Sequence, residues 1–418
     1  MMNTNKKTPK LRFKGFTDDW EQRKLSDIST KVTTKNIDVH YTETLTNSAE
    51  QGIISQVDFF DKEISNKDNI NGYYIVENND FIYNPRISTL APVGPINRNK
   101  LNRTGIMSPL YTVFRASNVD LDFLEWYFQS SHWHRYMKLN GDSGARADRI
   151  AIKDSTFFDM PIKTPVNIKE QVLIGETLEK FNQYITLHQR KLEKLKLNKS
   201  ALLQKLFPQK GCTIPDVRFK GFTDAWEQRK LNDFGIATGG TSIESEFVDG
   251  GTYKVINIGS YSEESVYNDQ GLRVNKTDKT KSRILNKYDL TMILNDKTAS
   301  GNIIGRVLLI DQDNTYVYNQ RTERIEVDTK NFLPMFLYHM LNAPEQRKYI
   351  VKASQGNTQI YVNWSTISNI DYMIPQLLLE QEKIANLFSL INKDITLHQR
   401  KLDCLISIKK GLLQQLFV

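Results

Sequence analysis

The sequence contains little of what secreted, zinc-binding or membrane proteins need. Only two of its 418 residues are cysteines, Cys212 and Cys404, and neither has a second cysteine or a nearby histidine at zinc-ligand spacing. No apolar run approaches the roughly 18 residues of a membrane-spanning helix, and no basic start leads into an apolar stretch as in a secretory signal. These absences argue against a disulfide-rich or zinc-held fold and predict a cytoplasmic protein that does not contact a membrane.

The composition is that of a globular protein with an excess of basic residues. Hydrophobic residues make up 39% of the 418, which is enough for two or three domains that each bury a core. The formal net charge is +8 at pH 7, which suits a polyanionic partner such as nucleic acid. Charge alone does not identify the partner, so the organisation of the chain has to supply the rest.

Two segments of the chain occur twice. The sequence RFKGFTDDWEQRKL at residues 12–25 returns with one change at 218–231, and ITLHQRKL at 185–192 returns unchanged at 395–402. Each copy of the second segment is followed by LLQKLF or LLQQLF. The chain therefore has two halves, and each half consists of an arm, a long variable region and a helical segment.

Each helical segment has an apolar stripe with a period of about 3.5 residues, which is typical of a coiled-coil seam. The seam positions are Ile174, Leu178, Phe181, Ile185, His188, Leu192, Leu195, Lys199, Leu202 and Leu206, and then Ile384, Phe388, Ile391, Ile395, His398, Leu402, Leu405, Lys409, Leu412 and Leu416. A histidine and a lysine stand at the same two places in both copies. We interpret the histidines as polar residues that fix the register rather than as metal ligands, because no carboxylate or cysteine shares the stripe.

Two seams in one chain can pair with each other. The pairing of two duplicated helices gives approximate twofold symmetry, as in a symmetric dimer. An antiparallel pair would place the two variable regions at opposite ends of the helices. We therefore predict two long antiparallel coiled-coil helices that join two separately folded domains.

The two variable regions predict mixed α/β domains in which strands precede a helix. The first has strand-like runs at 73–83 and 109–116, followed by an apolar helical stretch at 122–137. The second has the runs YKVINIG, YDLTMIL, GRVLLI and ERIEV, followed by a helical stretch at 332–341. A similar order with different residues indicates one fold adapted to two targets.

A polar loop that contains glycine follows the predicted helix in each domain, at 140–152 and at 353–362. Neither loop has the Gly-Lys-Ser/Thr of a phosphate-binding P-loop, and each is either an ordinary helix-to-strand turn or a base-reading loop. In the second case Arg146 and Arg149 can donate two hydrogen bonds to guanine, whereas Gln355, Asn357 and Gln359 can pair with adenine. Other candidate DNA contacts, should the loops not read bases, are Arg86, Arg98, Arg103, Lys297, Asn302 and Arg321.

These features together resemble the specificity subunit of a type I restriction-modification system, over essentially the whole chain. The WEQRKL arms, the two TLHQRKL…LLQ helices and the divergent domains between them carry the resemblance. It implies target recognition domains that each read one half of a split, asymmetric site in double-stranded DNA. It also implies that the helices space these domains and dock two modification subunits and, in the restricting complex, restriction subunits. No cofactor is then expected on this chain, while S-adenosylmethionine, ATP and Mg²⁺ are expected on the partner subunits.

With this resemblance the chain divides into four parts. The first recognition domain with its arm is expected at 1–165, and the first helix at 166–210. The second recognition domain with the repeated arm is expected at 211–375, and the second helix at 376–418.

Catalysis by the chain itself is the main alternative. An adenine methyltransferase needs an Asn/Asp-Pro-Pro-aromatic segment and a glycine-rich cofactor loop, but the sequence NPR at 84–86 lacks the second proline and the aromatic residue. A nuclease site at Pro215-Asp216 would need carboxylates to hold a metal ion, yet the first arm has Pro9-Lys10 at that place. His132 and His134 are two residues apart in a predicted helix and face different sides. We therefore expect a noncatalytic subunit; the alternatives are an autonomous DNA methyltransferase or nuclease, and a helical scaffold that binds only protein.

Overall fold

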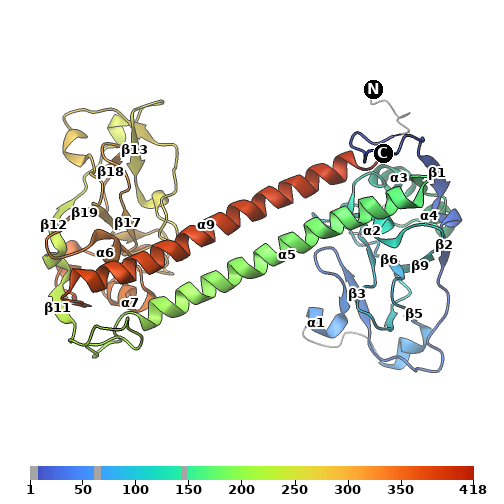
Figure 1. Cartoon of the computed structure of the whole chain (residues 1–418), viewed down its shortest axis with the longest axis horizontal. Coiled ribbons are helices and arrows are strands. Elements are labelled where there is room, and N and C mark those ends of the chain that lie inside the picture. The colour runs from blue at the N-terminus through green and yellow to red at the C-terminus, as the bar shows by residue number, and fades with distance from the viewer. Residues whose placement is uncertain (1–7, 61–66, 143–147) are drawn as a thin grey trace. The chain divides into compact units, whose positions relative to one another are not determined.

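The computed structural model describes residues 8–60, 67–142 and 148–418. The chain forms two compact units, one made of Met1–Gln189 with Arg400–Val418 and the other of Arg190–Gln399. The long helices α5 (Ile168–Lys205) and α9 (Leu378–Gln415) each begin in one unit and end in the other (Figure 1). Each unit is therefore completed by helical segments from both halves of the sequence.

The first unit is built on a four-stranded antiparallel sheet of order β2–β9–β6–β7. Its strands are β2 (Ser29–Lys31), β9 (Thr112–Ala116), β6 (Phe81–Tyr83) and β7 (Ile96–Arg98). Side chains alternate across the sheet: Phe81 and Tyr83 pack into the main core with helix α2 (Leu121–Gln129), whereas Ile82 enters a second cluster on the other face. Both faces of this sheet are thus buried.

Smaller elements surround that sheet. Two antiparallel strand pairs, β3 (Leu45–Ser48) with β4 (Gly52–Ser55) and β5 (Tyr74–Val76) with β8 (Gly105–Met107), contribute to the second cluster. The remaining helices are α1 (Gln56–Phe60), α3 (His134–Asn140) and α4 (Asp154–Phe158).

The continuous helix expected at 122–137 is wrong, because α2 ends at Gln129 and α3 begins only at His134. The Ser130 hydroxyl donates to the Tyr127 carbonyl at 2.6 Å, and the indole of buried Trp133 donates to the Phe128 carbonyl at 2.9 Å. These bonds satisfy the last carbonyls of α2 and turn the chain, which is how a helix with polar residues at its end commonly stops.

Helix α5 approaches α2 closely at a glycine. A Cβ atom built on Gly175 would lie 2.9 Å from Asp122 Cβ and 3.0 Å from the Phe123 backbone nitrogen, which is closer than such atoms pack. The repeat spacing places Ala385, which is 1% exposed, at the equivalent position of α9. The long helix therefore contacts the domain at the same position in both units, but only the second unit has room for a Cβ atom there.

The second unit repeats the same sheet order, β12–β19–β15–β17, again with antiparallel neighbours. These strands are β12 (Gly235–Gly239), β19 (Thr322–Val327), β15 (Leu290–Ile293) and β17 (Val307–Leu309). A three-stranded sheet of β14 (Arg273–Val274), β13 (Tyr253–Ile256) and β18 (Tyr316–Tyr318) lies beyond it, with β13 and β18 parallel. The first unit has the antiparallel pair β5 and β8 as its smaller sheet, so the domains differ most in this region.

The helices of the second unit are α6 (Pro334–Leu341), α7 (Pro344–Lys352) and α8 (Trp364–Ile367). Both α6 and α7 begin with proline, which suits the first turn because its missing N–H would have no helical partner there. The predicted mixed α/β architecture with two long helices is confirmed. Among the described residues no helix has the length and apolar character needed to cross a membrane.

Candidate nucleic-acid interface

The repeated arm of the first unit joins the beginning of one long helix to the end of the other. Arg12 donates from Nε and Nη2 to the Glu170 carboxylate at 2.7 and 2.9 Å, and the indole of Trp20 donates to the same carboxylate at 3.4 Å. The backbone N–H of Leu11 donates to the Gln415 carbonyl at 3.0 Å. The arm therefore fastens the start of α5 and the last turn of α9, which run antiparallel here.

The second unit repeats this set of contacts with the roles of the helices exchanged. Arg218 donates to the Glu380 carboxylate at 2.7 and 2.8 Å, and the Trp226 indole donates to it at 3.3 Å. The backbone N–H of Val217 donates to the Lys205 carbonyl at 3.0 Å. We call each of these two sets of contacts an arm clip. The residues of the first clip are Leu11, Arg12, Trp20, Glu170 and Gln415, and those of the second are Val217, Arg218, Trp226, Glu380 and Lys205.

The rest of the repeated arm closes each domain. In the first unit the sequence EQRK forms β1 (Glu21–Lys24), which pairs with the last strand β10 (Pro161–Thr164). In the second unit it forms β11 (Glu227–Lys230), which pairs with β21 (Asp371–Ile374). The leucine after each strand is fully buried. Much of the repetition noted in the sequence thus has an internal structural cause.

Every position of the predicted seam is buried or half-buried. In the first unit the Lys409 ammonium donates to Asn182 Oδ1 at 2.8 Å and lies 4.6 Å from the Trp126 ring centre. Burial lowers the pKa of Lys409, although Glu179 and Glu125 oppose that effect. The seam lysine therefore makes specific polar contacts between helices within that unit, as a register-fixing residue would.

The loop at 140–152 of the first unit is held, where it is described, against the segment that follows β6. Asp142 and Ala151 exchange backbone hydrogen bonds of 2.8 and 2.7 Å, and the Ile150 N–H donates to the Pro85 carbonyl at 3.0 Å. This pairing makes Arg86 and Arg149 bridge partners. The predicted base reader Arg146 lies outside the described residues.

Both described arginines of this loop region reach solvent. The Arg86 side chain is 68% exposed and the Arg149 side chain 35% exposed, and the Asp148 carboxylate lies 3.9 and 4.0 Å from their Nε atoms. Surface pairs at that distance contribute little to stability, so both guanidinium groups remain able to donate to a ligand.

The loop at 353–362 of the second unit has a similar attachment with different side chains. Gln355 and Tyr361 exchange two backbone hydrogen bonds of 2.9 Å, and the Val362 N–H donates to the Leu294 carbonyl at 2.9 Å. The short strands β16 (Asn295–Asp296) and β20 (Ile360–Tyr361) pair beside it. Gly356 has φ +103°, and a Cβ there would lie 2.2 Å from the Gln359 carbonyl oxygen, so this tight turn requires glycine. The three amide candidates Gln355, Asn357 and Gln359 are all exposed on this loop.

Three further candidates, Lys297, Asn302 and Arg321, belong to segments next to Leu294, the residue that holds this second loop. Arg321 adopts a left-handed conformation with φ +65°, and its carbonyl accepts from the Leu294 N–H at 2.9 Å. Lys297 is exposed directly after β16. Asn302 ends the same surface segment, but its side-chain amide donates to Glu263 at 2.9 Å. The buried Asp296 carboxylate shapes the segment by accepting from the backbone of Thr298 at 3.0 Å and of Ile303 at 2.8 Å.

The structure places two of the candidates elsewhere. Arg98 is 9% exposed, and its guanidinium is engaged by Asp122 and by Glu125, the latter at 2.7 Å, on helix α2. Arg103 is exposed but makes a two-bond pair with Glu43 at 2.8 and 2.7 Å. Neither side chain is free to donate to a base without giving up these contacts, so both are weaker candidates than Arg86 and Arg149.

Sequence reasoning missed Tyr361, which pairs through its backbone with both Gln355 and Asn295. Its side chain is 38% exposed, and its hydroxyl lies 3.4 Å from Gln355 Oε1. An exposed aromatic ring beside amides is a common element of nucleic-acid surfaces. The signal available in the sequence was the aromatic residue between two apolar ones directly after the polar loop.

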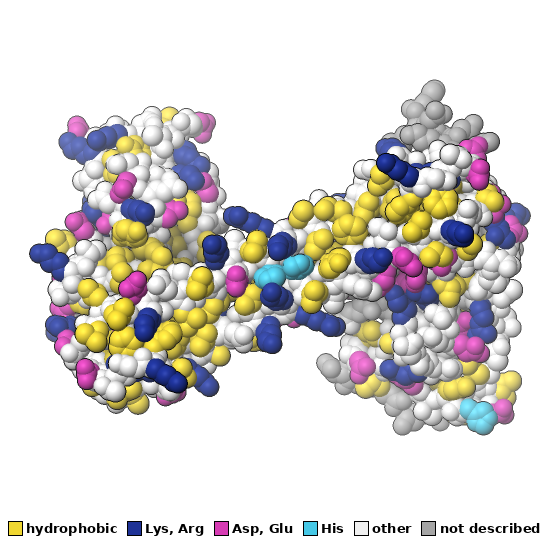
Figure 2. Space-filling view, viewed as in Figure 1, with side chains coloured by type: hydrophobic (Ala, Val, Ile, Leu, Met, Phe, Trp, Pro, Cys, Tyr) yellow, Lys and Arg dark blue, Asp and Glu magenta, His cyan; other side chains and the backbone are white. Residues whose placement is uncertain are grey.

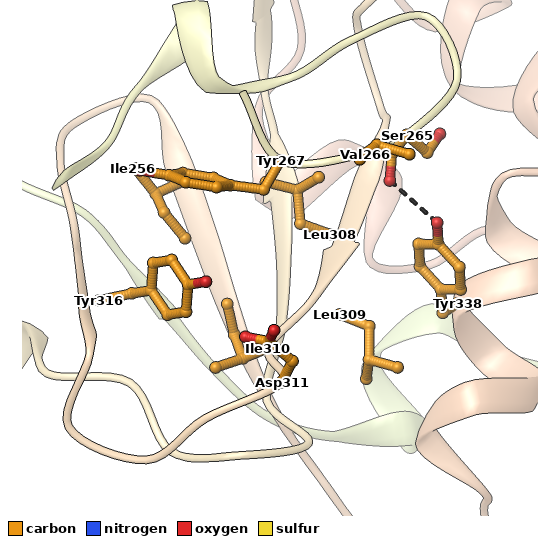
Figure 3. Close-up of a pocket in the computed structure, with 10 residues that line it drawn as sticks. All are labelled: Ile256, Ser265, Val266, Tyr267, Leu308, Leu309, Ile310, Asp311, Tyr316 and Tyr338. Atoms are coloured by element: carbon orange, nitrogen blue, oxygen red, sulfur yellow. Dashed lines mark hydrogen bonds between the residues drawn. The ribbon is translucent and has the colours of Figure 1, made fainter. Parts of the chain in front are cut away.

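A pocket of about 260 Å³ lies elsewhere in the second unit. It is formed mainly by apolar and aromatic side chains, among them Tyr267 and Tyr316, whose ring centres are 5.1 Å apart (Figure 3). The Tyr338 hydroxyl donates to the Ser265 carbonyl at 2.9 Å at one side of it. None of the predicted DNA-contacting residues is among the described side chains that line this pocket. Among the described residues no cluster of His, Cys, Asp and Glu could hold a metal ion.

Comparison with known proteins identifies the family of both units. The family model of the type I restriction modification DNA specificity domain matches the chain twice, at residues 17–197 and 223–405. The chain belongs to this specificity family. Each match covers one α/β domain with most of the following long helix, so the halves inferred from the repeats are two specificity domains.

Individual relatives agree with that assignment. The specificity subunit of the type I restriction enzyme MjaVIII from Methanocaldococcus jannaschii is 24% identical over 327 residues, which are 76% of this chain and 74% of that protein. The crystal structure of the S subunit of a type I restriction-modification system from M. genitalium superposes with a TM-score of 0.59 at 14% identity, covering 98% of this chain and 99% of that one.

A second solved chain, from work on complex assembly and conformational transition of the type I R-M system, gives a TM-score of 0.52 at 12% identity, over 96% of this chain and 98% of that one. At these identities the two structures support the fold. A specificity subunit is the noncatalytic member of its system, so this chain is not itself an enzyme.

Proposed function

We propose that this specificity subunit binds double-stranded DNA and reads a split, asymmetric site, one half with each recognition domain. The observation that carries this proposal is the shared attachment of the two loops. In both units the same backbone contact, Ile150 to Pro85 or Val362 to Leu294, holds the loop beside the sheet, while the exposed groups change from guanidinium to amide. A common frame with different hydrogen-bonding groups is what the reading of two different base sequences requires.

The second part of the proposal concerns protein partners. The repeated helix sequence keeps exposed residues as well as buried ones: Leu187 is 58% exposed and Leu397 is 47% exposed. Figure 2 shows hydrophobic side chains along the exposed surface of the long helices, interspersed with Lys and Arg. Identical exposed leucines in two copies suit two copies of one partner. We assign this role to two modification subunits, with restriction subunits joining in the restricting complex.

The chemistry of the complex then belongs to those partners. S-adenosylmethionine would be bound by the modification subunits, and ATP and Mg²⁺ would be used by the restriction subunits. This chain would supply the choice of sequence and the positions of the subunits.

A binding and methylation experiment tests the proposal. The purified chain, the modification subunit and their mixture are each assayed by gel shift at a fixed salt concentration and by methyl transfer to genomic DNA. We expect methylation from the mixture alone, at a two-part adenine motif identified by sequencing the modified DNA. Methyl transfer by the purified chain would support the autonomous enzyme, and a mixture that never binds DNA selectively would support the protein-only scaffold.

A further inference from the structure

Each repeated arm contains a surface turn outside its arm clip. We call residues 14–18 and 220–224, which both have the sequence KGFTD, the arm tips. Gly15 and Gly221 have φ +95° and +93°, and no heavy atom lies within 4 Å of the place where their Cβ atoms would be. The glycines are thus required by the backbone of the turn and not by close packing, and the turn faces open space.

The two arm tips expose the same side chains. The lysine, threonine and aspartate of each tip are exposed, and the phenylalanine, Phe16 or Phe222, is half-buried. The surroundings are not the same: the Lys383 ammonium lies 5.1 Å from the Phe222 ring centre, whereas the repeat spacing places Leu173 at the corresponding position in the first unit. Identical tips therefore sit beside different neighbours.

The long helices show what happens to exposed positions that lack a shared constraint. By the same spacing, Tyr184 corresponds to Asp394 and Lys180 to Leu390, and all four are exposed. In contrast, the buried clip residue Glu170 corresponds to Glu380. The halves have diverged at these exposed positions, so the identity of the exposed tip residues in both copies requires another cause.

The internal contacts of the tip do not supply that cause. The Arg12 guanidinium donates to the Asp18 carbonyl at 2.7 Å, which fixes the backbone of the first tip whatever its side chains are. This contact accounts for the turn but not for an identical, half-buried phenylalanine between glycine and threonine in both tips. The constraint shared by the two tips therefore acts from outside the chain.

We infer that each arm tip is a contact site for one modification subunit, with Phe16 and Phe222 as the anchoring side chains. The inference rests on the proposed function, which supplies a partner present in two copies. Each tip carries one lysine and one aspartate, so it has no net charge and suits a protein surface better than the DNA backbone. The partner would receive the ring in an apolar pocket and pair with the two flanking charges.

The stoichiometry of the assembled complex tests this inference. The full chain and its Phe16→Ser, Phe222→Ser and double variants are titrated with purified modification subunit, and the complexes are weighed by native mass spectrometry. At a concentration that saturates both sites of the wild type, we expect two, one, one and no bound modification subunits. Loss of an aromatic anchor from the centre of an interface typically weakens binding by roughly 30-fold or more.

A natural control exists in the chain. Asp19 corresponds to Ala225, the one difference between residues 12–25 and 218–231, so Asp19→Ala should leave binding of both modification subunits unchanged. Thermal unfolding of each variant shows whether the arm clip is intact.

Retention of two modification subunits with wild-type affinity by the folded double variant would overturn the inference while leaving the proposed function in place. Weakened DNA binding with normal subunit binding would also overturn it, since the tips would then belong to the nucleic-acid surface. A wild-type chain that binds no modification subunit would overturn both.

Discussion

The first unit carries Arg86 and Arg149 at the place where the second carries Asn295 and Tyr361, although equivalent backbone pairings hold both sets. Guanidinium groups only donate hydrogen bonds, whereas amides and phenols also accept them. The backbone frame is therefore separable from the chemistry it presents. Under the proposed function, substitutions on one loop would change the target of that half without altering the other half or the helices between them.

The interiors of the two units differ as well. In the sheet register, Tyr83 of the first unit pairs with Thr112, and the equivalent Met292 of the second pairs with Glu323. Glu323 is 5% exposed, so a carboxyl group is buried in one unit where the other has a hydroxyl. Differences of this kind allow the stability of the units to be perturbed one at a time.

The largest expected effect follows from breaking the arm clip, which the two units share. Glu170→Gln or Glu380→Gln removes the charge that pairs with a largely buried arginine, whose side chain is 15% or 13% exposed. An arginine left unpaired in such a place typically costs about 3–5 kcal/mol. We expect both variants to lower the free energy of unfolding by similar amounts, measured by urea denaturation.

The matched control for the clip variants is Glu176→Gln on the same helix. The Glu176 side chain is 56% exposed and lies 3.8 Å from Lys180, an i,i+4 surface pair worth about 0.5 kcal/mol or less. Clip variants that destabilise no more than this control would mean that the arm clip does not hold the helices.

Sequence predictions succeeded where a pattern repeats along the chain and failed where the structure depends on hydrogen bonds of single residues. Because a helical period repeats many times along the chain, the seam stripes at 174–206 and 384–416 run along α5 and α9, although each stripe begins after the helix has started. The break between α2 and α3 was missed, since it depends on hydrogen bonds made by Ser130 and Trp133 that no periodicity reveals.

For the candidate site, residue types were predictable but neighbours were not. Arg86 and Arg149 were both proposed from their chemistry, yet only the fold makes them bridge partners across a long stretch of sequence. Arg98 was proposed in the same group of further candidates as Arg86, but helix α2 supplies two carboxylates that engage it. Tyr361 was missed because an aromatic residue between apolar ones is typical of a buried strand.

The second prediction uses the buried carboxyl of the second unit. Burial raises the pKa of Glu323 to about 7 from an ordinary value of 4.5, with Arg283 opposing the shift. The stabilisation from the protonated carboxyl is therefore complete below about pH 4.5 and is lost as the pH rises through about 7. We expect Glu323→Gln to be more stable than the wild type at pH 8, by about 1–3 kcal/mol, and to lose this advantage near pH 4.5.

Urea denaturation at several pH values measures that difference. Glu382→Gln, at an exposed position of the same unit, should show no pH-dependent advantage. If Glu323→Gln and the wild type had the same pH dependence, the carboxyl would be ionised in the folded protein and the interior would tolerate its charge.

The third prediction separates the two loops by function. Arg149→Ala or Arg86→Ala should cost about 1–3 kcal/mol of DNA binding at one half-site and relax the base preference there only. Gln355→Ala or Gln359→Ala should act on the other half-site, and Arg146→Ala should group with Arg149→Ala. Binding is measured at one salt concentration to DNA with either half-site altered. Equal weakening on every sequence, with a smaller salt dependence, would show phosphate contacts instead of base contacts.

The smallest expected effect concerns the seam lysines, which occupy equivalent positions in different surroundings. Lys409 has the Asn182 oxygen at 2.8 Å and the Trp126 ring at 4.6 Å, so Lys409→Met should destabilise the protein by about 1–2 kcal/mol. Burial lowers the pKa of Lys199, and the charge of Arg306 lowers it further, with the charge of Glu264 opposing both effects. Lys199→Met removes a charge that is both desolvated and repelled, so it should be neutral or stabilise by up to about 1 kcal/mol. Urea denaturation of the two variants measures the contrast. Equal destabilisation by both would mean that the lysines act through the seam itself, as a repeated register device, and that their different neighbours contribute nothing.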